Sequence, residues 1–358
     1  MRAWVDFDIP TLVAALAAAG FAPSHARAIL REYYRGDGDI DFTRLRVGPR
    51  IQDWIEREMA PFRSIVAARA KSADGTIKLL LQFPDGGATE CVLMPGYRPD
   101  RAAACVSSQI GCAMGCDFCA STRGGLERNL TAGEIAEQYL RLKAQAARLG
   151  RQIKSLVFMG MGEPMHNLDN VIAGIRRIAD PDMGGLGWRQ VTVSTVGIVP
   201  GIDRLAQADL NVHLALSLHA PDDPTRSQIV PANRGYSVAQ IMAATRRFAE
   251  KTARIPTIEY CLLAGMNDQD EHARSLAALL DGFRAHVNLI PYNSIGAGIS
   301  GRQYQRPSAE RVIAFLNQLR ELGVVAHLRD TRGDDVSAAC GQLRRTALTL
   351  AGAALTGV

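Results

Sequence analysis

The sequence lacks any apolar stretch long enough to cross a membrane. Its longest apolar run, Leu12 to Pro23, falls short of the roughly 20 residues that a bilayer requires. Its first residues, Met-Arg-Ala-Trp-Val-Asp-Phe-Asp, carry acidic side chains where a secretion signal would be apolar. No repeat, long charge run or low-complexity segment is present, and the net charge of +5 permits a phosphate-bearing partner without requiring one. We therefore expect a protein of the reducing cytoplasm, with no membrane partner.

Three of the seven cysteines stand close together, and a fourth metal ligand is missing beside them. Cys112, Cys116 and Cys119 lie in the run Gly-Cys-Ala-Met-Gly-Cys-Asp-Phe-Cys. A structural zinc site would need a fourth Cys or His nearby, but the nearest candidate, Cys105, lies seven residues upstream. A four-iron cubane usually takes four cysteines, so three leave one iron open to a substrate or cofactor. The spacing is typical of radical S-adenosylmethionine (SAM) enzymes, in which SAM binds the open iron. Zinc and a disulfide remain the alternatives.

The chain of 358 residues, 47% of them hydrophobic, is long enough for one large domain and a smaller one. Short helices are expected at Leu12–Ala19, from Ser24 as cap to Tyr34, and at Arg50–Met59. Turn signals then separate three expected strands. The predicted division is a helical accessory module at 1–60, a small antiparallel β-unit at 61–97, the main domain at 98–343 and a tail at 344–358.

From residue 98 the pattern changes to strands followed by helices. The predicted strands are Ala103–Ser107, Ser155–Met159, Val191–Thr195, Val212–Leu218, Thr257–Leu262 and Val287–Ile290. The predicted helices are Ala132–Leu149, Leu168–Ile178, Ile202–Ala206, Val238–Lys251, Glu271–Leu280 and Ala309–Leu322, the first with a capping box of Thr131 and Glu134. Six such units predict an α/β fold with a partial (β/α)6 barrel. The active site of such a barrel would lie at the C-terminal ends of its strands.

Polar residues follow several of these strands. The Gly160–Pro164 turn contains Gly162, which lets backbone approach a ligand, and Glu163, which can accept a hydrogen bond from an ammonium group. Ser194, Ser217, His219 and Asn293 lie at other strand ends. Each alone is more often a cap or turn residue. Together they fit a rim that binds ribose and carboxylate groups.

The remaining cysteines carry weaker signals. Cys340 lies in a Gly- and Asp-rich loop, and a lone cysteine there is inert by default. Cys91, Cys105 and Cys261 lie in apolar strands, where cysteine acts as a small buried hydrophobe.

Several long motifs in the same order resemble the RlmN/Cfr family of radical SAM RNA methyltransferases. They are Cys105-Val-Ser-Ser-Gln-Ile-Gly-Cys112, Gly160-Met-Gly-Glu-Pro164, Ser217-Leu-His-Ala-Pro, Ile229-Val-Pro, Asn288-Leu-Ile-Pro, and Arg332-Gly-Asp-Asp with Ala-Ala-Cys340-Gly-Gln. The resemblance runs from about Glu90 to Leu343, and the first 60 residues match only loosely.

The resemblance implies a role for each matched residue. Cys112, Cys116 and Cys119 would hold one [4Fe-4S] cluster. Cys340 would carry a methyl group, Cys105 would resolve the intermediate and Glu90 would act as the general base. The SAM site would be lined by Gly162, Glu163, Ser194, Ser217, Leu218, His219 and Asn293.

The family mechanism implied by the resemblance explains why thiols lie outside the cluster. An sp² carbon of adenine is a poor nucleophile, so ordinary methyl transfer from SAM fails. One SAM methylates Cys340, and a second yields a 5′-deoxyadenosyl radical that takes a hydrogen from that methyl group. The methylene radical adds to the base, Glu90 removes the ring proton, and Cys105 attacks the Cys340 sulfur to form a disulfide and release the product.

The resemblance also implies the partners. The substrate would be an adenosine in large-subunit ribosomal RNA, methylated at carbon 2, with transfer RNA as a second candidate, and the base would flip out of its stack. The enzyme would be a monomer served by a flavodoxin- or ferredoxin-type electron donor. Three alternatives remain: methylation at carbon 8, a radical SAM enzyme with a non-RNA substrate, and a non-catalytic zinc-containing RNA-binding module.

Overall fold

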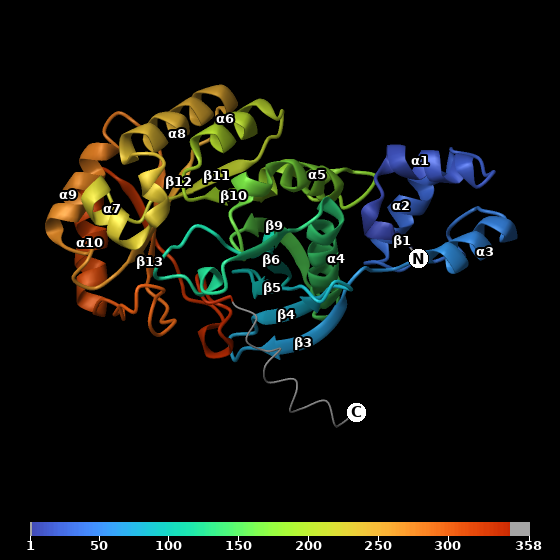
Figure 1. The fold of residues 1–358 in the computed structure, drawn as a ribbon, viewed down its shortest axis with the longest axis horizontal. Coiled ribbons are helices and arrows are strands. Elements are labelled where there is room, and N and C mark those ends of the chain that lie inside the picture. Colours follow the sequence, from blue (N-terminus) through green and yellow to red (C-terminus); the bar gives the residue numbers. More distant parts are fainter. Residues whose placement is uncertain (1, 344–358) are drawn as a thin grey trace.

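The computed structural model describes residues 2–343, and its central feature is a 10-stranded sheet (Figure 1). The strand order is β14-β13-β12-β11-β10-β9-β6-β5-β4-β3. The strands are β3 Ile65–Lys71, β4 Ile77–Gln82, β5 Ala88–Pro95, β6 Arg101–Cys105, β9 Gln152–Phe158, β10 Val191–Thr195, β11 His213–Ser217, β12 Thr257–Leu262, β13 His286–Pro291 and β14 Val325–Leu328. The sheet therefore joins both predicted groups of strands.

Within this sheet β6, β9 and the strands from β10 to β14 are parallel, and helices connect them. The helices are α4 Ala132–Arg148, α5 Leu168–Ala179, α6 Val199–Gln207, α7 Asp223–Ile229, α8 Val238–Thr252, α9 Asp270–Leu279 and α10 Ala309–Glu321. The predicted Thr131–Glu134 capping box forms, with Glu134 N–H donating to the Thr131 hydroxyl at 3.2 Å. The α/β partial barrel is confirmed, while α7 and the edge strand β14 were not predicted. No described helix could span a membrane.

The antiparallel strands β3, β4 and β5 extend this sheet rather than forming a second one. β5 pairs with β6 in antiparallel register, with Val92 opposite Cys105. Because side chains alternate along a strand, Glu90, Val92 and Cys105 share one face of the sheet. The predicted strands of the β-unit are confirmed, and its status as a domain stays a prediction.

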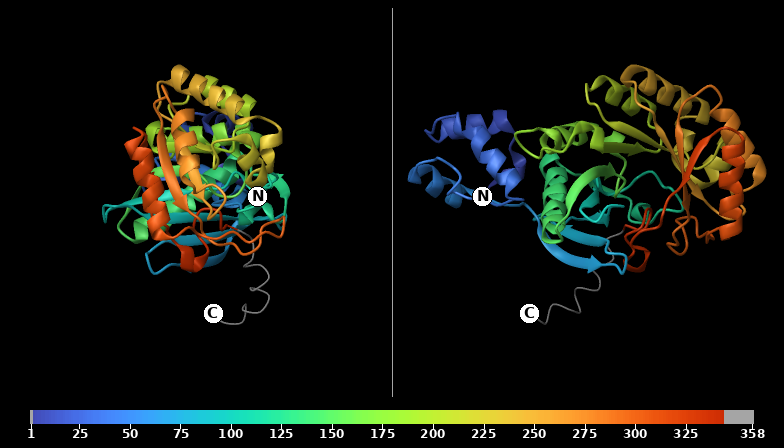
Figure 2. Two further views of the ribbon diagram at one scale, coloured as in Figure 1. Left: turned by 90° about the vertical axis from the view of Figure 1, so that its left-hand side faces the viewer. Right: turned by 180° about the vertical axis from the view of Figure 1, so that it is seen from behind.

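The N-terminal helices lie at the end of the molecule opposite α9 and α10 (Figures 1 and 2). They are α1 Ile9–Ala18, α2 His25–Arg35 and α3 Pro49–Glu58, and the short strands β1 Arg2–Ala3 and β2 Met59–Ala60 pair in parallel. The predicted capping role of Ser24 is wrong, because its backbone is itself helical and its hydroxyl makes no cap hydrogen bond. The segment before α1 packs closely on α4, where a Cβ on Gly133 would stand 2.8 Å from the Val5 carbonyl oxygen.

The two faces of the sheet have different neighbours. One face packs against α4, α5, α6 and α8 through a continuous apolar core that includes Leu79, Ala104 and Leu156. Fully burying one such aliphatic side chain stabilises the fold by about 1.5–3 kcal/mol. On the other face a smaller cluster, including Val92 and Cys105, lies under the segment that carries Ala338 and Leu343. That second face carries the candidate site.

Candidate active site

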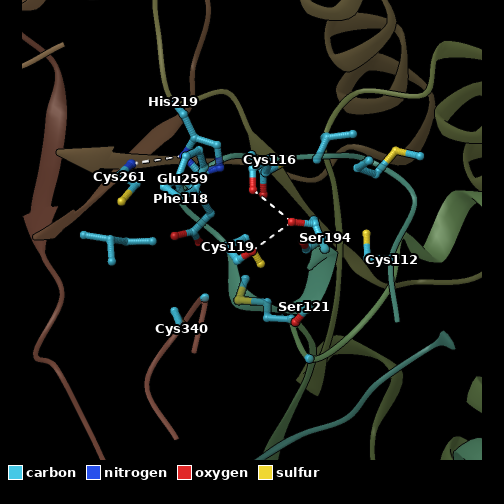
Figure 3. Close-up of a pocket in the computed structure, with 18 of the residues that line it drawn as sticks. Cys112, Cys116, Phe118, Cys119, Ser121, Ser194, His219, Glu259, Cys261 and Cys340 are labelled. Atoms are coloured by element: carbon cyan, nitrogen blue, oxygen red, sulfur yellow. Dashed lines mark hydrogen bonds between the residues drawn. The ribbon is translucent and has the colours of Figure 1, made fainter. Parts of the chain in front are cut away.

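A cavity opens at the C-terminal ends of the parallel strands, and we name it the first cavity (Figure 3). Most of the predicted site residues line it: Cys112, Cys116, Cys119, Gly162, Glu163, Ser194, Ser217, His219, Asn293 and Cys340. Ser194 and Ser217 lie in the last two residues of β10 and β11, and the others lie in loops after strands; the sheet brings these strand ends to one edge. Among the residues predicted to bind SAM, Leu218 is the exception: its side chain is buried in the core under α8 and α9.

The cysteine loop is shaped by close backbone contacts. It lies between the paired strands β7 Gln109–Gly111 and β8 Leu126–Asn129. Gly111 has φ of 75°, and a Cβ there would stand 1.9 Å from the Gly125 carbonyl oxygen, so only glycine fits. The Asp117 carboxylate accepts hydrogen bonds from the Ser300 N–H and the Tyr304 hydroxyl, each at 2.8 Å. These contacts fix the loop against the far side of the cavity.

The three thiols of this loop are shielded from water. Burial raises the pKa of Cys112 to about 12 and raises the pKa values of Cys116 and Cys119 as well. Among residues 2–343, no group of three or more His, Cys, Asp or Glu side chains is placed to hold a metal ion. The three thiols nevertheless face one cavity from one loop. Three cysteines from one short loop are the donor set of a cubane cluster that leaves one iron open.

The Gly160–Pro164 turn presents Glu163 to the first cavity. The Glu163 carboxylate accepts hydrogen bonds from the Met165 N–H at 3.0 Å and the Val196 N–H at 2.9 Å. Burial nevertheless raises its pKa above the usual range of a carboxyl group. Gly162 has φ of 98°, and a Cβ there would stand 2.5 Å from the Gln109 side chain. The turn is thus too tight for any other residue, and it fixes a carboxylate whose remaining lone pairs face the cavity.

His219 is held as a neutral ring. Its Nδ1 accepts a hydrogen bond from the Cys261 N–H at 3.0 Å (Figure 3). Burial, together with the charge of Arg226, lowers its pKa to about 3. Arg226 is fully buried and donates to the Leu218 carbonyl at 2.9 Å and to the Val196 carbonyl. One guanidinium therefore ties together the ends of β10 and β11 beneath the cavity.

A second cavity adjoins the first one and shares Met159, Asn293 and Arg329 with it. Cys105 and Cys340 both line it, and Cys340 lines the first cavity too. Burial, with the Cys340 thiol nearby, raises the pKa of Cys105 to about 12. All seven cysteines lie within the described residues and are free thiols. Cys340 is thus the only cysteine among residues 2–343 that lines both cavities.

The segment that carries Cys340 is anchored from both sides. Asn293 Nδ2 donates to the Cys340 carbonyl at 3.2 Å, and the Ala120 N–H donates to the Gly341 carbonyl at 2.7 Å. From the antiparallel strands, Lys78 Nζ donates to the Ser337 carbonyl at 3.1 Å. The same Lys78 pairs with Glu90 at 3.1 Å. Glu90 is only 1% exposed and is not among the described residues that line either cavity.

Comparisons with known proteins agree with this geometry. Residues 106–277 match the model of the radical SAM superfamily. A protein of Opitutus terrae named as a probable dual-specificity RNA methyltransferase RlmN 1 is 52% identical over 95% of this chain and 96% of its own length. The chain belongs to the RlmN family.

Other members of the RlmN family and a solved structure extend the match. A Moorella thermoacetica protein with the corresponding name is 49% identical, over 91% of this chain and 92% of its own. The crystal structure of a radical SAM methyltransferase from Sphaerobacter thermophilus superposes with a TM-score of 0.90 at 41% identity, covering 96% of this chain and 99% of that one. The predicted resemblance and the enzyme class are therefore confirmed.

Membership of the RlmN family also confirms the predicted cofactors. Radical SAM enzymes use a [4Fe-4S] cluster and SAM, and both can be accommodated by the residues present here. The first cavity offers three thiols from one loop, an acidic side chain and several polar strand ends within one space.

Two charged residues at the site of this RlmN family member, Arg329 and Glu259, were not predicted from the sequence. Arg329 lines both cavities, and its guanidinium lies 3.7 Å from the carboxylate of Glu259, which lines the first cavity. Glu259 is 3% exposed, and burial raises its pKa. An acidic residue within the apolar strand Thr257–Leu262 was a usable signal, because a buried acid needs a partner. Arg329 had no comparable signal.

Proposed function

We propose that the enzyme methylates carbon 2 of an adenosine in RNA through a methyl group carried on Cys340. The position of Cys340 on both cavities is the observation that supports this most directly. A sulfur at that position can receive a methyl group from the first cavity and can transfer it in the second cavity, without a large movement of the loop. The names of the relatives include dual specificity. We propose that their two substrates here are large-subunit ribosomal RNA and transfer RNA.

Residues of the first cavity would bind the cofactors. Cys112, Cys116 and Cys119 would hold the cluster, and Glu163 would accept from the ammonium group of SAM. The other polar residues of the rim, Gly162, Ser194, Ser217, Leu218, His219 and Asn293, would orient the rest of SAM, Leu218 through its backbone. When bound, the cluster and SAM supply the methyl group and a 5′-deoxyadenosyl radical.

Glu90, next to Val92 on the same face of the sheet, and Cys105 of the second cavity would complete the reaction on the base. Glu90, whose carboxylate lies 3.1 Å from Lys78 Nζ, would take the ring proton. Cys105 would then attack the Cys340 sulfur. The S–S bond forms, the bond from sulfur to the methylene carbon breaks, and its electron pair stays with that carbon, which takes up a proton.

The remaining assignments rest on the family resemblance. We propose that residues 1–60 form an accessory module that contacts RNA, that 61–97 form a β-unit, that 98–343 form the catalytic domain, and that 344–358, outside the described residues, form a tail. The enzyme would act as a monomer with a flavodoxin- or ferredoxin-type donor. Seven free thiols support a reducing compartment such as the cytoplasm.

The test is anaerobic incubation of the reconstituted enzyme with SAM, a reductant and ribosomal RNA fragments, followed by mass spectrometry of the nucleosides. The expected product is 2-methyladenosine. Cys340→Ala should give none, whereas Cys91→Ala, on the opposite face of the sheet, should retain activity. An exclusive 8-methyl product would reject the proposed position, and normal product from Cys340→Ala would reject the methyl-carrying role.

A further inference from the structure

An aromatic side chain beside the second cavity is the most exposed large apolar side chain of the described residues. Tyr97 is 93% exposed, and the next, Ile65, is 64% exposed. Single exposed apolar side chains are common on protein surfaces, so exposure alone identifies no site. Two further features, the structure of the turn and the neighbours of the ring, indicate a binding site.

The turn that carries Tyr97 is well braced. It connects β5 to β6, and its ends are joined by a hydrogen bond from the Gly96 N–H to the Arg101 carbonyl at 2.9 Å. On the side of β9, the Gln152 N–H donates to the Asp100 carbonyl at 2.8 Å, and Arg151 Nε donates to the Pro99 carbonyl at 3.1 Å. The ring is therefore presented to solvent from an ordered backbone. Such pre-organisation lowers the entropy lost when a ligand binds.

The ring faces the segment that carries Cys340. The guanidinium carbon of Arg332 lies 5.9 Å from the centre of the Tyr97 ring. Arg332 lines the second cavity together with Cys105 and Cys340. Tyr97 follows β5, the strand of Glu90, and precedes β6, the strand of Cys105. The Tyr97 ring therefore lies beside Arg332, which lines the second cavity, and is itself open to solvent.

We propose that Tyr97 and Arg332 form a stacking site for an unpaired nucleobase that neighbours the base entering the second cavity. This inference rests on the proposed function, because it requires an RNA substrate. An aromatic ring and a guanidinium plane are the two surfaces on which proteins stack single-stranded bases. The exposed Arg98 and Arg101 of the same turn add cations for the RNA backbone. This positive charge favours RNA over an apolar protein partner.

The test compares Tyr97→Ala, Tyr97→Phe and Tyr97→Trp in the reconstituted holoenzyme. The control is Ile313→Ala, which removes a 45% exposed side chain on α10. The Kd of a fluorescently labelled ribosomal RNA fragment is measured by anisotropy, and KM and kcat are measured for methylation of the same fragment. Stacking of one base corresponds to roughly 1–3 kcal/mol, so Tyr97→Ala should raise Kd and KM by about 5- to 100-fold with little change in kcat. The Kd and KM of Tyr97→Phe, Tyr97→Trp and the control Ile313→Ala should stay near the wild-type values.

A coupling measurement sharpens the proposal. Because one base would contact both side chains, Tyr97→Ala and Arg332→Gln should weaken RNA binding less in combination than the product of their separate effects. Independent effects that multiply would contradict a shared stacking site. A Tyr97→Phe variant as weak as Tyr97→Ala would also overturn it, because the hydroxyl rather than the ring would then be the contact.

Measuring binding and turnover separately distinguishes the two proposals. RNA that binds to the wild type but is never methylated would reject the proposed function, and the stacking site would still be judged from Kd. Methylation by the wild type, with an unchanged Kd and KM in Tyr97→Ala, would reject the stacking site alone. Slower reduction of the cluster by a protein electron donor in Tyr97→Ala, at unchanged RNA affinity, would assign Tyr97 to a protein interface and overturn the proposal.

Discussion

The parallel and antiparallel parts of the sheet contribute to the site in different ways. The parallel strands β9 to β13 end around the first cavity and supply its polar rim. The antiparallel strands β4 and β5 supply Lys78 and Glu90, and β6, at the junction of the two parts, supplies Cys105. The loop of Cys340 contacts both parts, through Asn293 on one side and Lys78 on the other.

The first cavity is therefore a general type of site, and the second cavity is a specialised one. A parallel barrel places strand ends at one edge whatever the reaction, so the first cavity needs only the cysteine loop and a polar rim to bind cofactors. The second cavity depends on an antiparallel extension and one anchored loop. The fold would therefore bind cofactors with one part and act on the base with the other.

The largest effect should come from a change that disables both parts. Cys116→Ser replaces a proposed thiolate ligand of the cluster with a hydroxyl group, which binds iron poorly. We expect iron content, 5′-deoxyadenosine formation and RNA methylation all to fall to background, with Cys91→Ala as the matched control. Iron analysis and the visible absorbance of the cluster measure the iron content. Chromatography measures 5′-deoxyadenosine formation and RNA methylation. A full iron content in Cys116→Ser would remove it from the ligand set.

Changing Cys105 should separate the two parts. Cys105→Ala leaves the first cavity intact but removes the thiol that would attack Cys340. We expect cleavage of SAM to continue, released product to fall to background, and RNA to accumulate in covalent linkage to Cys340. Denaturing gels and peptide mass spectrometry would detect the adduct. Normal release of methylated RNA would show that another group resolves the intermediate.

A smaller effect should be confined to the cofactor part. Glu163→Gln keeps the shape of the side chain but removes the negative charge that would face the SAM ammonium group. A hydrogen bond to a charged group contributes about 1.5–3 kcal/mol, so the dissociation constant of SAM should rise by about 10- to 100-fold. Equilibrium dialysis measures it, and RNA affinity should not change. An equal loss of RNA affinity would mean that the two cavities do not bind independently.

The sequence predicted the parallel part better than the antiparallel part, for physical reasons. The strands Val191–Thr195 and Thr257–Leu262 form within their predicted bounds, because apolar runs followed by amphipathic helices are a strong local signal. The strands of the β-unit were also predicted, but not that β5 would pair with β6, since strand pairing depends on distant residues. The closeness of Arg329 to Cys105 arises in the same way: chain segments more than 200 residues apart meet only in the folded sheet.

The smallest predicted effect concerns stability, and it tests whether the rim of the first cavity is built around a neutral ring. His219 has a pKa of about 3 in the folded protein and an ordinary value near 6.5 when unfolded. Between these values the unfolded chain binds the extra proton, so this residue should lower the free energy of unfolding by roughly 1.4 kcal/mol for each pH unit below about 6.

His219→Asn cannot be protonated, and Asn tolerates the left-handed backbone at this position, where φ is 61°. Its side-chain oxygen can accept from the Cys261 N–H in place of Nδ1. Denaturant unfolding of both proteins between pH 4.5 and 7.5 should give a shallower loss of stability at low pH for His219→Asn, and identical slopes would mean that the ring can take up a proton without leaving its site.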